Sequence, residues 1–189
     1  MADRKLEGMR VAILATNGFE EPELLEPRAA LDAAGAKTTL IAPTGGKIYG
    51  MKHHDKGREV EVDLELAQAN PAQFDAVLLP GGALNADALR VEKHAQQFVR
   101  EMDQHGRPIA FICHAPWLLV SAGLTNGRTL AGYHTIRDDI QNAGGKWVDQ
   151  KAVRDRNWVS SRKPTDIPDF DKEMIELFAA GKARAMGNS

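Results

Sequence analysis

The stretch GRPIAFICHAPWLLVSAGL, residues 106–124, contains the only cysteine of the 189-residue chain. Its apolar first half is typical of a buried strand, and Pro116 suits the first turn of a helix, where no backbone donor is needed. Cys113 therefore stands at a predicted elbow between strand and helix, which points a side chain away from the sheet. The free N–H groups of the next helical turn would lower its thiol pKa. Cys113 is a candidate nucleophile, with core packing or an intermolecular disulfide as the alternatives.

The composition fits one compact α/β domain without disulfides. The formal net charge is −2, with 24 basic and 26 acidic residues spread along the chain, so no nucleic-acid partner is expected. The start of the chain is charged and then apolar for about six residues. A signal peptide needs an apolar region of roughly 7–15 residues and a membrane span needs about 20, so we expect a cytoplasmic protein without a membrane partner.

Apolar runs alternate with segments of helical spacing along the chain. Strands are expected at 10–16, 37–43, 74–82 and 108–113, with one or two late strands within 146–162. This alternation predicts a mostly parallel sheet covered on both faces, a doubly wound α/β/α sandwich. Residues 45–63 suggest a hairpin at the edge, Pro27 is expected to kink or break the first helix, and residues 182–189 are expected to form a frayed tail.

Three of the predicted strands end in unusual residues. The first is followed by Glu20, Glu21 and Glu23, the third by a Pro-Gly-Gly turn ending at Gly82, and the fourth by Cys113. Parallel strands bring their carboxyl ends to one edge, where ligands bind in doubly wound sheets. Glu23 is the preferred candidate to meet the thiol, and burial there would raise its pKa and let it move a proton. Glu20 and Glu21 are expected to face solvent. The alternative is that all three carboxylates only stabilise the N-terminus of their own helix.

The backbone amides of Gly82 and His114 are candidates for an oxyanion hole. Side chains of neighbouring residues on a tight turn point in different directions, so Cys113 and His114 need not form a dyad. A working His114 requires a third group to orient it, and Asp87 is a candidate, although it is not expected to reach His114 within one subunit. The alternative is that His114 is a partly exposed elbow residue.

Other titratable residues give weaker signals. His53, His54 and Asp55 could suggest a metal site, but neighbouring histidines on a polar loop are expected to be solvated. Tyr133 and His134 follow a predicted strand and are expected to look into the pocket.

The chain resembles the PfpI-type intracellular cysteine proteases of the ThiJ/PfpI superfamily, which also contains the parkinsonism-associated deglycase. Five collinear segments carry the resemblance: NGFEEPELLEP, AVLLPGG, AFICHAPWLLVSAG, TIRDDIQNAGG and WVSSRKPTDIPDF. It implies one ThiJ/PfpI-like domain over residues 1–189, similar to class I glutamine amidotransferases, with a flavodoxin-like fold. Cys113 would be the nucleophile, Glu23 the acid beside the sulfur, and the amides of Gly82 and His114 the oxyanion hole. Asp87 would complete His114 of a neighbouring subunit, which requires a homodimer or a higher homo-oligomer.

The resemblance implies several activities. The preferred one is a cofactor-independent cysteine enzyme of the stress response that acts on glyoxals or early glycation adducts, as glyoxalases and deglycases do. The first alternative is a peptidase or amidase with a Cys113–His114–Asp87 triad, acting on a peptide substrate. The second is a non-enzymatic sensor of oxidative stress in which Cys113 is oxidised.

Overall fold

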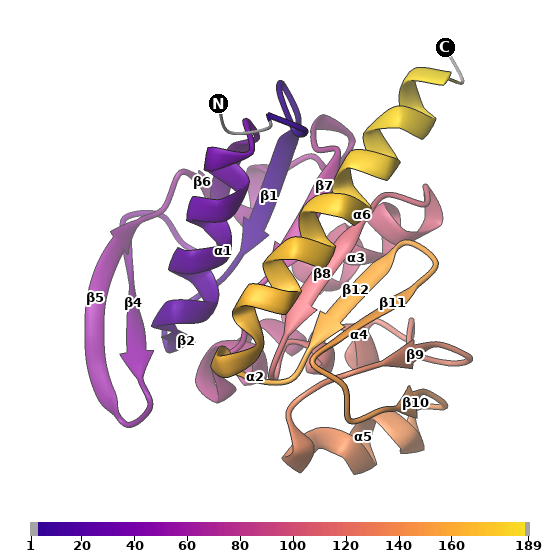
Figure 1. Ribbon diagram of the computed structural model, residues 1–189. Coiled ribbons are helices and arrows are strands. Elements are labelled where there is room, and N and C mark those ends of the chain that lie inside the picture. Colours follow the sequence, from indigo (N-terminus) through magenta and orange to yellow (C-terminus); the bar gives the residue numbers. More distant parts are fainter. Residues whose placement is uncertain (1–3, 188–189) are drawn as a thin grey trace.

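The computed structural model describes residues 4–187 and contains one large sheet between two layers of helices (Figure 1). The seven strands of this sheet lie in the order β11 (Ala152–Asp155), β12 (Trp158–Ser161), β8 (Ile109–Ile112), β7 (Ala76–Leu79), β1 (Arg10–Leu14), β3 (Lys37–Ala42) and β6 (Leu64–Glu65). All neighbours are parallel except β11 and β12. Numbered along the chain, the strands β1, β3, β7, β8 and β12 have the spatial order 2-1-3-4-5, so the predicted flavodoxin-like sandwich is confirmed.

Each face of the sheet has its own core. Along β1, Val11 and Ile13 pack into one hydrophobic cluster while Ala12 and Leu14 pack into the other, as the twofold alternation of a strand requires. The first cluster lies under α1 (Glu21–Ala33) and α6 (Ile167–Gly187). The helices whose residues enter the second cluster are α2 (Ala83–Arg90), α3 (Lys93–Gln104), α4 (Pro116–Ser121) and α5 (Arg137–Asn142).

Two small sheets extend the main one. The expected hairpin at 45–63 is confirmed as β4 (Lys47–Lys52) and β5 (Asp55–Glu61), which β2 (Phe19–Glu20) joins in parallel to β4. The second small sheet pairs β9 (Thr129–Leu130) with β10 (Lys146–Trp147). Short 3₁₀ turns occupy Leu66–Gln68, Pro71–Gln73, His134–Ile136 and Pro164–Asp166.

Three expectations about the elements need correction. Helix α1 is not broken at Pro27, which is buried within it, although proline removes the bond that the Glu23 carbonyl would accept in a regular helix. Residues 182–187 belong to α6 instead of fraying, and Lys182 Nζ donates to the Glu7 carbonyl at 2.6 Å; residues 188–189 lie outside the described part. The segment 146–162 holds three strands, because β10 pairs separately with β9.

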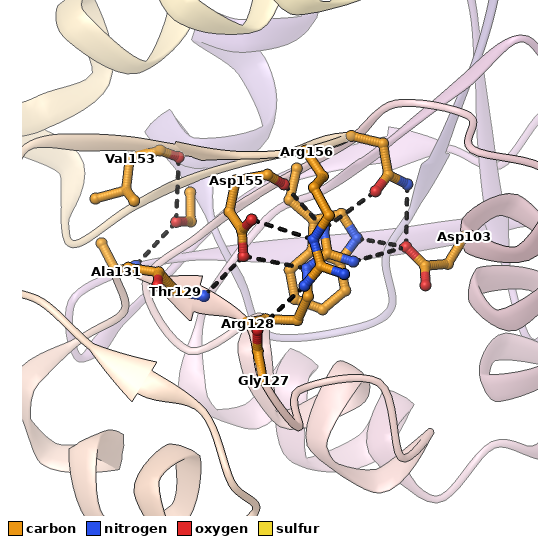
Figure 2. Close-up of polar contacts among 11 residues, drawn as sticks. Asp103, Gly127, Arg128, Thr129, Ala131, Val153, Asp155 and Arg156 are labelled. Carbon is orange, nitrogen blue, oxygen red and sulfur yellow. Dashed lines mark hydrogen bonds and ion pairs between the residues drawn. The ribbon is translucent and has the colours of Figure 1, made fainter.

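A buried arginine links the late strands to α3 (Figure 2). Arg128 is 5% exposed, forms ion pairs of 3.2 Å with both Asp103 and Asp155, and donates to the Asn157 side chain. Its guanidinium lies 3.6 Å from the centre of the Trp158 ring. A buried charge of this kind is tolerated because its donors are satisfied by two carboxylates and an amide. None of the helices of residues 4–187 has the length and apolar character needed to span a membrane.

Candidate functional site

Cys113 occupies a strained elbow directly after β8. Its φ of 63° lies in the left-handed region, which non-glycine residues rarely adopt. The backbone is held on both sides, since the Cys113 N–H donates to the Ser161 carbonyl and the Cys113 carbonyl accepts from the Tyr133 N–H. The residue is 6% exposed. The predicted elbow is therefore present. Hydrogen bonds to neighbouring segments hold Cys113 in a backbone conformation that the residue would rarely adopt without them.

Glu23 lies in the first turn of α1, and its side chain is fully buried. A Cβ on Gly81 would collide with Glu23 Oε2 and would lie 2.6 Å from Cys113 Cβ, so the glycine backbone fills the space between the carboxyl and the cysteine. Burial raises the pKa of Glu23 to about 8, while the nearby Cys113 thiol opposes the rise. At neutral pH this carboxyl is protonated, as the sequence predicted.

The carboxyl of Glu23 has spare hydrogen-bonding capacity. Neither of its oxygens has a partner of ordinary hydrogen-bond geometry among the described residues, although the carboxyl and the Cys113 thiol are near enough to shift one another's pKa. Buried polar groups without partners are uncommon and are costly to keep. The arrangement leaves an acid proton free for a molecule bound at the sulfur.

The predicted lowering of the thiol pKa is wrong. Burial raises the pKa of Cys113, and the nearby Glu23 carboxyl raises it further. The backbone N–H groups of Gly82 and His114 face the sulfur and pull the pKa down, but by less. Helix α4 is only six residues long and starts at Pro116, so its partial charge does not outweigh the loss of solvent. The sulfur is thus a thiol at neutral pH, and it needs a base before it can attack.

His114 supplies a nitrogen at the right place. Its Nδ1 lies 3.1 Å from Cys113 Sγ, so the two adjacent side chains meet, which the tight turn by itself does not require. The ring stacks on Tyr133 at 4.8 Å, and its Nε2 lies 3.5 Å from Thr135 Oγ1. Burial lowers the pKa of His114, and the nearby His134 lowers it further. His114 is therefore a neutral imidazole that can accept the thiol proton at Nδ1.

The glycine loop after β7 holds its amides against the cysteine. Gly82 has a φ of +94°, and a Cβ there would collide with the Gly18 carbonyl. Asn85, fully buried, fixes the loop: its Nδ2 donates to the Gly81 carbonyl at 3.0 Å and its Oδ1 accepts from the Thr16 N–H at 2.7 Å. The structure thus brings the predicted oxyanion-hole amide to the sulfur. Asn85 and Thr135 were missed, because single small polar residues leave no pattern in a sequence.

The other two glutamates do not face solvent, so that expectation was wrong. Glu21 is 8% exposed and forms an ion pair with Arg58 Nε at 3.2 Å. Glu20 is 14% exposed and accepts from the His53 N–H at 3.3 Å. Both are covered by the β4–β5 hairpin, which ties them away from the cysteine.

The remaining candidates lie outside the cluster at the cysteine. Asp87 is exposed on α2, and no contact joins it to His114 among the described residues. His53 and His54 are exposed at the tip of the β4–β5 hairpin. Within residues 4–187, no group of three or more histidine, cysteine or carboxylate side chains is placed to hold a metal ion.

The arrangement of elbow, glycine loop and buried glutamate occurs in a chain whose residues 9–177 match the sequence profile of the DJ-1/PfpI family. The chain belongs to the DJ-1/PfpI family. Among its relatives, the protein named deglycase PfpI of Pyrococcus furiosus is 40% identical over 169 residues, which cover 89% of this chain and 99% of the relative. Deglycase PH1704 of Pyrococcus horikoshii is 41% identical over the same coverage.

Solved structures of DJ-1/PfpI proteins have the same fold as this chain. Drosophila melanogaster DJ-1beta superposes with a TM-score of 0.83 and 27% identity, covering 95% of this chain and 96% of the other. A two-domain protein of Anabaena variabilis, with DJ-1/ThiJ/PfpI-like and ferritin-like domains, gives a TM-score of 0.86 at 29% identity, covering 93% of this chain and 49% of that one. The resemblance stated from the sequence motifs is thereby confirmed.

Proposed function

We propose that this chain is a cofactor-independent cysteine enzyme of the deglycase and glyoxalase type, which acts on glyoxals and their early adducts with amines. The observation that carries the proposal is a protonated, buried Glu23 with no ordinary hydrogen-bond partner beside the Cys113 thiol. Such a pair offers one carbonyl compound both a nucleophile and an acid. The names of the archaeal relatives, which are called deglycases, support the same assignment.

The first step forms a covalent bond to the substrate aldehyde. Cys113 gives its thiol proton to His114 Nδ1, which lies 3.1 Å away, as the sulfur attacks the aldehyde carbon. The carbonyl oxygen takes a proton from Glu23, and the N–H groups of Gly82 and His114 steady the developing negative charge. The product is a hemithioacetal on Cys113, with Glu23 left as a carboxylate and His114 as an imidazolium.

The second step moves a proton along the substrate. With methylglyoxal, the Glu23 carboxylate removes the hydrogen from the carbon bonded to sulfur and returns it to the neighbouring carbon, while the proton of the new hydroxyl passes to the former ketone oxygen. Together these two transfers convert the hemithioacetal into a thioester of lactate. Water then attacks the thioester, the sulfur leaves, and lactate is released. The proton on His114 and those released by the hydrolysis restore the Cys113 thiol and the Glu23 acid, and the balance is one methylglyoxal and one water consumed for one lactate and one proton formed. A pKa of about 8 suits Glu23 to both tasks, because both of its protonation states are accessible near neutral pH.

Early glycation adducts can enter the same sequence. In a carbinolamine, the carbon that was the aldehyde carries a hydroxyl and the amine. Attack by Cys113 breaks the carbon–nitrogen bond, and the amine leaves with the proton held by His114. The carbon is then the same hemithioacetal. Glu23 has kept its proton on this route and releases it to solvent before the second step, so one site accounts for both activities.

The deciding experiment measures lactate formed from methylglyoxal in thiol-free buffer. Cys113→Ser should abolish turnover, and Glu23→Gln should reduce it by about 100-fold or more, because the amide cannot transfer a proton. Asp87→Ala should turn over normally if chemistry is complete within one chain. No lactate from a protein whose thiol is confirmed by mass to be fully reduced would refute the proposal.

A peptidase remains the second candidate, favoured by the 3.1 Å contact between Cys113 Sγ and His114 Nδ1. It would need Asp87 of a neighbouring copy at the Nε2 side of His114, and therefore a homodimer or larger assembly. In that case Asp87→Ala should abolish hydrolysis of a fluorogenic peptide, and dilution to the monomer should do the same. Activity that survives both changes would exclude the subunit-crossing triad.

A redox sensor is the third candidate, since the unpartnered Glu23 carboxyl could donate to an oxidised Cys113 sulfur. It predicts selective oxidation of Cys113 by peroxide with no turnover of methylglyoxal. We also propose that the protein acts in the cytoplasm, whichever of the three functions it has.

A further inference from the structure

A hollow of about 780 Å³ lies at the opposite edge of the main sheet from Cys113. Its lining includes Arg107 and Pro108, which directly precede β8, whereas Cys113 directly follows the same strand. The other walls include the loop before β1, the turn between β11 and β12 and the last turns of α6. The loop before β1 and the end of α6 both lie at the upper end of the molecule in Figure 1. The volume lies within the range of about 300–1,000 Å³ found for small-molecule sites.

The charged side chains of this hollow are mostly positive. It is lined by four cationic side chains, Arg107, Arg156, Lys182 and Arg184, and by two carboxylates, Glu7 and Asp75. Both carboxylates already have cationic partners outside the lining. Glu7 forms an ion pair of 2.7 Å with Arg4, and Asp75 accepts from the Arg10 N–H at 2.7 Å and faces its guanidinium at 3.5 Å.

The cations of the hollow, by contrast, are held largely by neutral groups. Arg107 donates to the Pro71 carbonyl at 2.6 Å, and Lys182 donates to the Glu7 backbone carbonyl at 2.6 Å. Neither they nor Arg184 form an ion pair with a carboxylate in the part of the chain that the structure describes. These carbonyls position the side chains without cancelling their charge.

Arg156 is fixed by the network at the end of β11. Its Nη2 donates to the Gly127 carbonyl at 3.1 Å, and its Nε faces Asp155 at 3.3 Å (Figure 2). The Asp155 carboxylate also pairs with buried Arg128, which has a second carboxylate partner in Asp103. The surplus positive charge of the hollow therefore rests on Arg107, Lys182 and Arg184. Arg107 and Lys182 are held by backbone carbonyls before any ligand binds, which reduces the entropy cost of binding.

We propose that this hollow binds a small phosphate-bearing molecule with at least two negative charges. Arginine and lysine side chains donate charge-assisted hydrogen bonds to phosphate oxygens, and arginine does so through two donors at once. The concave shape favours a small anion over an extended polyanion, which would need a continuous basic surface. The volume leaves room for an organic group beyond the phosphate.

The test uses isothermal titration of the full chain with inorganic pyrophosphate at low salt. We expect a dissociation constant below about 1 mM, and roughly tenfold weaker binding in each of Lys182→Gln and Arg184→Gln. Lys146→Gln is the matched control: it removes one charge from an exposed position on β10, outside the hollow, and should change the constant less than twofold. Equal weakening in all three variants would show only a general charge effect and would overturn the proposal, as would no binding to the wild-type protein.

A second measurement keeps the test independent of how the variants fold. In amide-resolved NMR of the wild-type protein, pyrophosphate should shift the signals of Gly106 and Gly181, whose backbones line the hollow, and leave Gly82 unchanged. Saturable shifts confined to other parts of the chain would contradict the assigned position.

Discussion

Replacing Glu23 by glutamine should change how the stability of the protein depends on pH. Glutamine has nearly the same shape but stays neutral at every pH, whereas Glu23 must lose its proton inside the core. Raising its pKa from 4.5 to about 8 means that the folded state binds this proton more tightly than the unfolded state. At about 1.4 kcal/mol for each factor of ten, the difference amounts to about 5 kcal/mol.

The sign follows from proton linkage. Because the folded pKa is raised, the contribution of Glu23 is fully present below pH 4.5 and is lost as the pH rises toward about 8. The wild-type free energy of unfolding should therefore fall with pH across this window, by up to about 5 kcal/mol relative to the variant. A constant cost of the new amide shifts the whole Glu23→Gln curve and does not change this difference.

The assay is urea unfolding at several pH values between 4.5 and 8, for the wild type, Glu23→Gln and the control Glu65→Gln. Glu65 is exposed, so its variant should run parallel to the wild type. Parallel curves for wild type and Glu23→Gln would mean that Glu23 does not change protonation in this window. The acid assigned to the reaction would then be absent.

Three further predictions concern the elbow and its support. Gly82→Ala should destabilise the protein by about 1–3 kcal/mol in urea unfolding and abolish lactate formation. The reason is that a side chain at φ +94° would collide with the Gly18 carbonyl. A variant with the stability of the wild type would contradict this prediction. Arg128→Met should lower the free energy of unfolding by about 3–5 kcal/mol in the same assay, because it leaves two aspartates without their buried partner. Turnover per folded molecule should stay unchanged. A loss below about 1 kcal/mol would show that the network is dispensable. Alkylation of Cys113 by iodoacetamide should keep accelerating beyond pH 9, because burial raises the thiol pKa, whereas a plateau below pH 7 would refute the raised pKa.

Much of the site could be predicted from the order of the elements. Glu23, Gly82 and Cys113 follow three different strands, and the parallel pairing of β1, β7 and β8 brings the ends of these strands to one edge. This convergence needs no knowledge of side-chain geometry. It follows from the alternation of apolar strand segments and helical segments along the chain, which predicts a parallel sheet.

What failed depends on contacts between distant segments. Glu21 is buried only because the β4–β5 hairpin, about 35 residues later, places Arg58 against it. The thiol pKa depends on how completely three separate loops cover the sulfur, and helix-terminus reasoning does not include that burial. Thr135 and Asn85 carry no periodic signal, so only the folded chain shows their contacts with His114 and the glycine loop.

The central claim, a protonated Glu23 beside the Cys113 thiol, is tested most directly by infrared difference spectroscopy of wild type against Glu23→Gln. Asp171, whose pKa is also raised, to about 7, is removed from the comparison by carrying Asp171→Asn in both proteins. We predict that the C=O band of a protonated carboxylic acid is present at pH 6, disappears as the pH rises through about 8, and is missing in the variant. Identical spectra of the two proteins in this region at pH 6 would show that Glu23 is ionised, and would contradict the proposed proton transfer.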